Sequence, residues 1–318
     1  MKKILAAVAA FALIATSLVG CGGGSAEGPK SLTLATGGDS GTYYAVGGVL
    51  GTTLSPKLEK SSVAAVTSGA SKANIQMIDM KEADLAIVQN DVMTYAINGT
   101  DLFEGEKYES FSAVASIYAE TCQIVAVDGI TSVEELKGKT VSVGDAGSGT
   151  EFNARQILAA HGITFDDINV VNLGFGDSAN AIKDGKIDAA FVTAGHPTTA
   201  VVELCTTVDI NILPVDDAHA QALIAEYPYY TQVTIPGGTY STVEEDVTTV
   251  AVMATLIANN ELSEDVVYEL LKAMDENLDS LRNGHAKFEE FSIESAANGI
   301  GIDFHPGAQK YLEEKGVL

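Results

Sequence analysis

Residues 35–50 read ATGGDSGTYYAVGGVL and place a glycine-rich loop between a short apolar strand and a helix. We expect the strand over 31–35 and the helix over 44–58. A junction of this kind exposes the free N–H groups of the first helical turn, where the helix dipole is positive. It can therefore bind an anion without any basic side chain.

The same tripeptide, Ser-Gly-Thr, returns at 148–150 within SVGDAGSGTEFNARQIL, residues 142–158. Here too a strand (140–143) is expected before the loop and a helix (151–161) after it. Taken singly, each junction is no more than a good helix start. The matched pair predicts two lobes built alike, with a ligand cleft where the two helix starts converge.

Short strands and helices alternate through the first two-thirds of the chain, which is typical of an α/β fold with a largely parallel sheet. Further strands are expected at 62–67, 84–90, 120–129, 168–173 and 187–195, with helices at 71–82 and 178–186. Ser132 and Glu135 form a capping box for another short helix. The last third combines a long apolar strand (246–258) with amphipathic helices at 263–281 and 306–315.

The chain of 318 residues is about twice a typical domain, and 46% of its residues are hydrophobic, which favours two lobes with sizeable cores. We expect lobe I to comprise 31–117 and 235–318, and lobe II to comprise 118–234. A formal charge of −25 argues against binding nucleic acid. Because Arg155 and Arg282 are the only arginines, an anion-binding cleft must draw its positive potential mainly from helix N-termini.

The N-terminus has the order of a lipoprotein signal: basic Lys2 and Lys3, an apolar stretch over 4–17, and a small residue before Cys21. We expect residues 1–20 to be removed, Cys21 to be lipidated, and 21–30 to act as a flexible tether. The alternative is an ordinary signal peptide with an incidental cysteine. Either predicts an extracytoplasmic protein, and the first anchors it by lipid to a bacterial membrane.

The chain lacks the motifs that common enzyme classes need. The loop at 144–150 resembles a phosphate loop but has no lysine, and Ser148 lacks the Gly-x-Ser-x-Gly context. The five histidines are scattered, so we expect no catalytic residue, no metal and no cofactor. Cys122 and Cys205 either pair in an oxidising compartment or remain as two buried free thiols.

Several long segments resemble the TAXI-type extracytoplasmic solute receptors of TRAP transporters. They are 35–50 and 141–158, already quoted in large part, with DLAIVQNDV (84–92), DGKIDAAFVTAGHP (184–197), YPYYTQVTIPGGTY (227–240), DVTTVAV (246–252) and HPGAQKYLEEKG (305–316). The resemblance covers most of the mature chain in order. It implies a two-lobed α/β periplasmic binding protein of type II, whose hinged cleft closes over a small carboxylate such as glutamate or 2-oxoglutarate.

By position, the resemblance also implies a set of ligand-binding residues and partners. The lobe I wall would be Thr36, Gly41, Thr42, Tyr43, Gln89 and Asn90. The lobe II wall would be Ser148, Gly149, Thr150 and the turn of Thr193, Ala194 and Gly195. The receptor would act as a monomer and deliver its cargo to integral TRAP permease subunits driven by an ion gradient. Glu120 is either a hinge-side acid or an acceptor for a ligand ammonium group, and Arg155 either reaches a carboxylate or forms a surface ion pair.

Three other functions stay open at this point. The chain could be the substrate-binding lipoprotein of an ABC importer, whose fold and cleft would be similar. It could be a secreted enzyme, which would require a nucleophile–base pair or a metal. It could also be a ligand-sensing pair of lobes that feeds a signalling partner.

Overall fold

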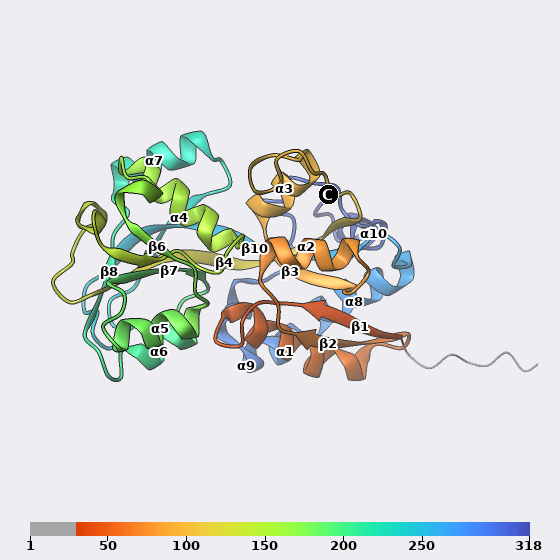
Figure 1. Ribbon diagram of the computed structural model, residues 1–318. Coiled ribbons are helices and arrows are strands. Elements are labelled where there is room, and N and C mark those ends of the chain that lie inside the picture. Colours follow the sequence, from red (N-terminus) through yellow and green to blue (C-terminus); the bar gives the residue numbers. More distant parts are fainter. Residues whose placement is uncertain (1–29) are drawn as a thin grey trace, which may run out of the picture.

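The computed structural model describes residues 30–318 as two lobes joined by long strands (Figure 1). The predicted signal segment, the lipidation site Cys21 and most of the predicted tether lie outside the described residues. Within 30–318, no helix combines the length and the apolar character that a membrane crossing requires.

The two lobes share one ten-stranded sheet and repeat the same strand order within it. In lobe I the order is β2-β1-β3-β10-β4, and in lobe II it is β6-β5-β7-β4-β8, while β9 pairs with β10. The strands are β1 (Lys30–Ala35), β2 (Ser61–Val66), β3 (Leu85–Gln89), β4 (Phe111–Val127), β5 (Thr140–Ser142), β6 (Asn169–Val171), β7 (Ala189–Ala194), β8 (Ile210–Leu213), β9 (Thr231–Ile235) and β10 (Val247–Asn259).

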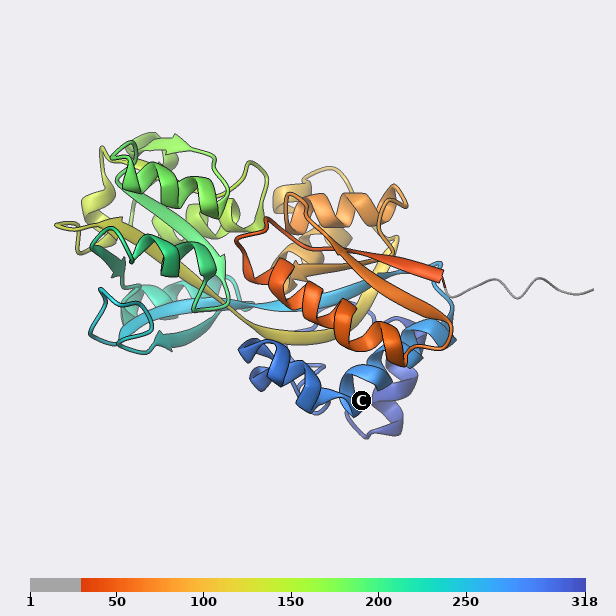
Figure 2. The same ribbon diagram turned by 90° about the horizontal axis from the view of Figure 1, so that it is seen from below.

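Strands β4 and β10 carry the chain between the lobes, as both views of the ribbon show (Figures 1 and 2). The first part of β4, Phe111–Tyr118, pairs antiparallel with β10 in lobe I. Its second part, Thr121–Val127, pairs with β7 and β8 in lobe II. Each lobe therefore contains one antiparallel strand inserted beside its parallel ones, and the inserted strands form the hinge between lobes.

Helices cover both faces of the sheet in each lobe. They are α1 (Thr42–Leu54), α2 (Ser71–Asp79), α3 (Asn90–Asn98), α4 (Gly149–Ala160), α5 (Phe175–Lys183), α6 (Thr199–Leu204), α7 (Asp217–Glu226), α8 (Glu264–Glu276), α9 (Leu278–Gly284) and α10 (Pro306–Glu314). In lobe I, α1, α8 and α10 pack over one core, and α2 and α3 pack over the other. In lobe II, α4 and α7 cover one face, and α5 and α6 cover the other. Because both faces are covered, central strands such as β3 and β7 are buried along their whole length.

Most predicted strands and helices are confirmed to within a few residues, with three informative differences. The helix predicted over 263–281 is two helices, because the backbone of Asn277 leaves helical geometry. The side-chain amide of Asn277 donates to the Ala273 carbonyl at 2.9 Å and so competes with the backbone for this acceptor. Helix α3 was not predicted, since it follows β3 without any loop and so has no turn signal before it. Strand β4 begins nine residues before the strand predicted at 120, because its lobe I half was not recognised.

The second crossing between lobes lies further along the chain than residue 235, where the sequence placed it. Ile235, Tyr240 and Val247 pack with α5 and α6 residues in a lobe II core. Val250 and Val252 pack in the other lobe II core. We therefore place the crossing within β10.

Cys122 and Cys205 are both buried free thiols.

The close packing of α1 on β2 gives a matched pair of glycine variants. A Cβ at Gly51 would lie 2.7 Å from the Val63 carbonyl oxygen, whereas a Cβ at Gly48 would have nothing within 4 Å. We expect Gly51→Ala to lower the free energy of unfolding by about 1–3 kcal/mol through overpacking. Gly48→Ala should raise it by about 0.5–1 kcal/mol, because alanine loses less backbone entropy in a helix. Urea denaturation measures the free energy of unfolding of both variants. A Gly51→Ala variant that is more stable than the wild type would contradict the close packing of α1 on β2.

Candidate ligand-binding cleft

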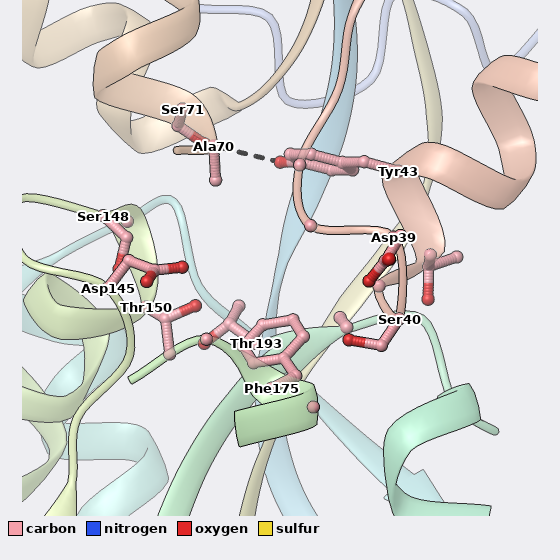
Figure 3. Close-up of a pocket in the computed structure, with 18 of the residues that line it drawn as sticks. Asp39, Ser40, Tyr43, Ala70, Ser71, Asp145, Ser148, Thr150, Phe175 and Thr193 are labelled. Carbon is pink, nitrogen blue, oxygen red and sulfur yellow. Dashed lines mark hydrogen bonds between the residues drawn. The ribbon is translucent and has the colours of Figure 1, made fainter. Parts of the chain in front are cut away.

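A cavity of about 360 Å³ lies between the two lobes (Figure 3). Tyr43 and Ser71 lie on its lobe I side, Ser148 and Thr150 lie across from them, and Phe175 closes another side. These residues come from loops and helix starts at the carboxyl ends of parallel strands. Open α/β sheets bind their ligands at this edge.

Four helices begin at the cavity: α1 and α2 from lobe I, and α4 and α5 from lobe II. The predicted helix starts after the two Ser-Gly-Thr segments are confirmed, since α1 begins at Thr42 and α4 at Gly149. The first-turn N–H groups and the positive dipole ends of these helices therefore face one space.

The four helix starts are not equivalent. Helices α1 and α2 have no side-chain cap and no acidic residue in the first turn. In α4, Ser148 Oγ accepts from the Glu151 N–H at 3.2 Å, and Glu151 Oε2 accepts from the Gly147 N–H at 2.6 Å. Helix α5 has Asp177 in its first turn. The least compensated positive potential is therefore on the lobe I side.

The charged side chains that line the cavity are all acidic. Asp39, Asp145 and Asp177 are exposed to solvent, and Glu120 is buried. No lysine, arginine or histidine belongs to the described lining of this cavity. Asp39 and Asp145 lie on opposite sides of the cleft (Figure 3).

Glu120 is the one fully enclosed carboxyl group of the cleft, with only 2% of its surface exposed. Tyr43 Oη donates a hydrogen bond to Glu120 Oε2 at 2.6 Å and lies 3.5 Å from Ser71 Oγ. Burial raises the pKa of Glu120 to about 8. The group can therefore be neutral in an empty cleft and become ionised when a cation approaches it.

Polar contacts between the lobes flank the cavity. Gln89 Nε2 donates to Asn153 Oδ1 at 3.0 Å, and Asn153 Nδ2 donates to Tyr230 Oη at 2.7 Å and to Asp91 Oδ2 at 3.2 Å. Burial raises the pKa of Asp91 to about 7. On the other side, Thr42 Oγ1 donates to the Gly195 carbonyl at 3.0 Å. The structure is thus a closed arrangement of the lobes.

Nine of the residues predicted for the two walls line the cavity: Gly41, Thr42, Tyr43, Gln89, Ser148, Gly149, Thr150, Thr193 and Ala194. The other three lie outside the lining and support it. Thr36 Oγ1 donates to the Val66 carbonyl at 2.6 Å. Asn90 Nδ2 donates to the Gly299 carbonyl at 3.2 Å, and Asn90 Oδ1 accepts from the Met253 N–H of β10 at 3.0 Å. Gly195 accepts the Thr42 hydroxyl from the opposite lobe.

The sequence prediction missed the α5 side of the cleft. Phe175, Asp177 and Asn180 line the cavity, and so does Asp145 of the second loop. The strand predicted at 168–173, followed by Gly174 and the helix predicted at 178–186, is the same kind of junction as the other two and could have indicated that the start of α5 faces the cleft. Arg155 does not line the cavity: it lies 3.4 Å from Glu151 and over the Phe165 ring, so its surface ion pair is confirmed.

A family model described as the NMT1-like family matches residues 34–316. The chain belongs to the NMT1-like family. Among solved structures, PhnD1 from Prochlorococcus marinus, in complex with methylphosphonate, aligns with a TM-score of 0.55 at 11% identity, covering 91% of this chain and 100% of that one. The alkanesulfonate-binding protein SsuA from Xanthomonas axonopodis pv. citri, bound to MOPS, has a TM-score of 0.51 at 15% identity, covering 91% and 85%.

A third similar structure is a putative L-cystine ABC transporter from Listeria monocytogenes, with a TM-score of 0.51 at 15% identity, covering 81% of this chain and 95% of that one. At these identities the similarity concerns the fold. The NMT1-like chain therefore has the predicted fold of a two-lobed α/β periplasmic binding protein.

Gly149 of this NMT1-like chain lies directly against Gln89 of the opposite lobe. A Cβ at Gly149 would overlap Gln89 Oε1 of lobe I. We expect Gly149→Ala to wedge the lobes apart and raise the radius of gyration measured by small-angle X-ray scattering. Gly38→Ala is the control, because a Cβ there has nothing within 4 Å although Gly38 lines the same cavity. Equal radii of gyration for the two variants would contradict the prediction and show that the Gln89 side chain moves away from the new methyl group.

The buried carboxyl group of Glu120 gives a pH prediction. Its pKa is raised from the ordinary 4.5 to about 8, so the folded state binds the proton more tightly than the unfolded state does. Stability of the ligand-free protein should then fall as pH rises from about 5 to about 8. Glu120→Gln should reduce this slope by about 1.4 kcal/mol per pH unit. Exposed Glu203→Gln is the control, and identical slopes in urea denaturation would contradict the prediction.

Proposed function

We propose that this protein is the extracytoplasmic solute receptor of a TRAP transporter of the TAXI type. It captures a small carboxylate by closure of its cleft and delivers it to an ion-gradient-driven permease. One observation carries the proposal: helix starts from both lobes open onto one cavity, where first-turn N–H groups, and no basic side chain of the described lining, are available to an anion. Carboxylates are among the anions that helix N-termini bind.

Closure of the two lobes about the crossing strands explains how a ligand would be retained. A ligand held by α1 and α2 gains further contacts with the Thr150 hydroxyl and the start of α4 only when lobe II closes. A ligand shifts the lobes toward the closed state by as much as its affinities for the two states differ. Contacts made with both lobes at once supply that difference, and the crossing strands β4 and β10 supply the motion.

The sequence-based proposals on location and partners complete this function. Cleavage before Cys21 and its lipidation would hold the receptor at the outer side of a bacterial membrane, within reach of its permease. We propose a monomer that binds its cargo without catalysis. The described lining contains no histidine, cysteine or lysine that could act beside a hydroxyl as a base, and Ser148 Oγ caps α4.

A binding protein for an ABC importer is the second candidate. The Listeria protein with a similar fold is itself described as a putative L-cystine ABC transporter, and the structures of PhnD1 and SsuA contain methylphosphonate and MOPS, respectively. Uptake into vesicles that contain the receptor and its permease separates the two candidates. Uptake that requires an ion gradient supports TRAP, and uptake that requires ATP supports ABC.

The carboxylate proposal predicts a thermal-shift result. Small carboxylic acids, including amino and keto acids, should raise the melting temperature, since a bound ligand stabilises the folded state. The same compounds with the α-carboxylate replaced by an amide should not. Thr150→Ala should weaken the best ligand about tenfold, the loss of one hydrogen bond of about 1–1.5 kcal/mol. Thr206→Ala on the lobe II surface is the control. If no carboxylate shifts the melting temperature, the proposed ligand class is wrong.

A further inference from the structure

We infer that the cleft selects an amino acid with one carboxylate and no second negative charge, and that Glu120 receives its ammonium group. This inference rests on the proposed function and narrows it. It separates neutral amino acids from glutamate and 2-oxoglutarate, the two cargoes that the sequence resemblance implies.

The charges in the lining leave no counterion for a second carboxylate. Four carboxyl groups and no basic side chain belong to the described lining of the cavity. Of the nearby cations, Lys287 Nζ pairs with Glu290 at 2.6 Å and is 8% exposed, and its charge also lowers the pKa of Glu120 against the larger effect of burial. Lys72 Nζ donates to the Leu102 carbonyl at 2.6 Å. A dicarboxylate would therefore bring a further negative charge among like charges.

The helix starts provide positive potential for about one carboxylate. Each uncompensated helix N-terminus is equivalent to roughly half a positive charge, so α1 and α2 together balance about one negative charge. The starts of α4 and α5 are already partly compensated by Glu151 and Asp177. A second carboxylate on the lobe II side would lie beside Asp145 and Asp177, which line the cavity there.

Glu120 has the position that ammonium recognition requires. It lines the cavity from β4, is 2% exposed, and is held by the Tyr43 hydroxyl at 2.6 Å. An ammonium group next to an enclosed carboxylate forms a charge-assisted hydrogen bond in a medium of low dielectric constant. A keto oxygen could accept a hydrogen bond from the protonated Glu120, but it gains no charge pairing with the carboxylate. The Tyr43 and Phe175 rings and Ala194 supply apolar surface for an uncharged side chain.

Isothermal titration calorimetry of the mature receptor with two matched ligand pairs tests the inference. Glutamine and glutamate differ in one side-chain charge, and alanine and pyruvate differ in the amino group. We expect the neutral amino acid of each pair to bind at least tenfold more tightly than its partner. Binding near pH 7 should also release a proton from Glu120, seen as a dependence of the heat on the buffer.

Glu120→Gln should weaken the binding of the amino acids at least tenfold and abolish the proton release. It should also narrow the difference in affinity between alanine and pyruvate. Glu203→Gln, an exposed substitution of the same kind in lobe II, should change none of these values. Wild-type protein that binds glutamate or 2-oxoglutarate as tightly as the neutral amino acids would overturn the inference and leave the carboxylate function standing. Failure to bind any carboxylate would instead remove the proposed function itself.

Discussion

The antiparallel pairing of β4 with β10 is the constraint on which the rest of the structure depends. These two strands belong to the sheets of both lobes, so their register fixes where each lobe begins and which sheet edges face one another. Because the parallel strands of each lobe end at the facing edges, the loops that follow them meet in the cleft. Glu120 lies on β4 at this crossing, so the hinge also contributes a side chain to the cavity.

The acidic character of the chain gives the cleft its chemistry. A protein of net charge −25 repels anions over most of its surface, and long-range attraction cannot bring a carboxylate to it. The positive potential of the cleft is local and comes from backbone N–H groups, which bind at short range and with defined direction. Such a site distinguishes ligands by where each charge lies. The enclosed carboxyl of Glu120 sharpens this discrimination.

Much of the fold could be predicted from the sequence, because apolar periodicity and glycine punctuation report local structure. The two Ser-Gly-Thr junctions led directly to Thr42, Ser148 and Thr150, all of which line the cavity. What could not be predicted depends on contacts between distant segments. Nothing near Asn90 or Gly195 in the sequence indicates that they would face a strand or the opposite lobe. The crossing within β10 was misplaced for the same reason, since one apolar run serves two cores.

The unequal helix starts give the capture of a solute an order in time. Under the proposed function, an arriving carboxylate would first meet the starts of α1 and α2, which have no side-chain cap and no acidic first-turn residue, beside the Tyr43–Glu120 pair. In α4, Ser148 Oγ already accepts from the Glu151 N–H, and both α4 and α5 carry an acidic residue in the first turn, so lobe II would attract a free carboxylate less strongly. The proposed capture would therefore begin at lobe I, and lobe II would close over the bound solute afterwards.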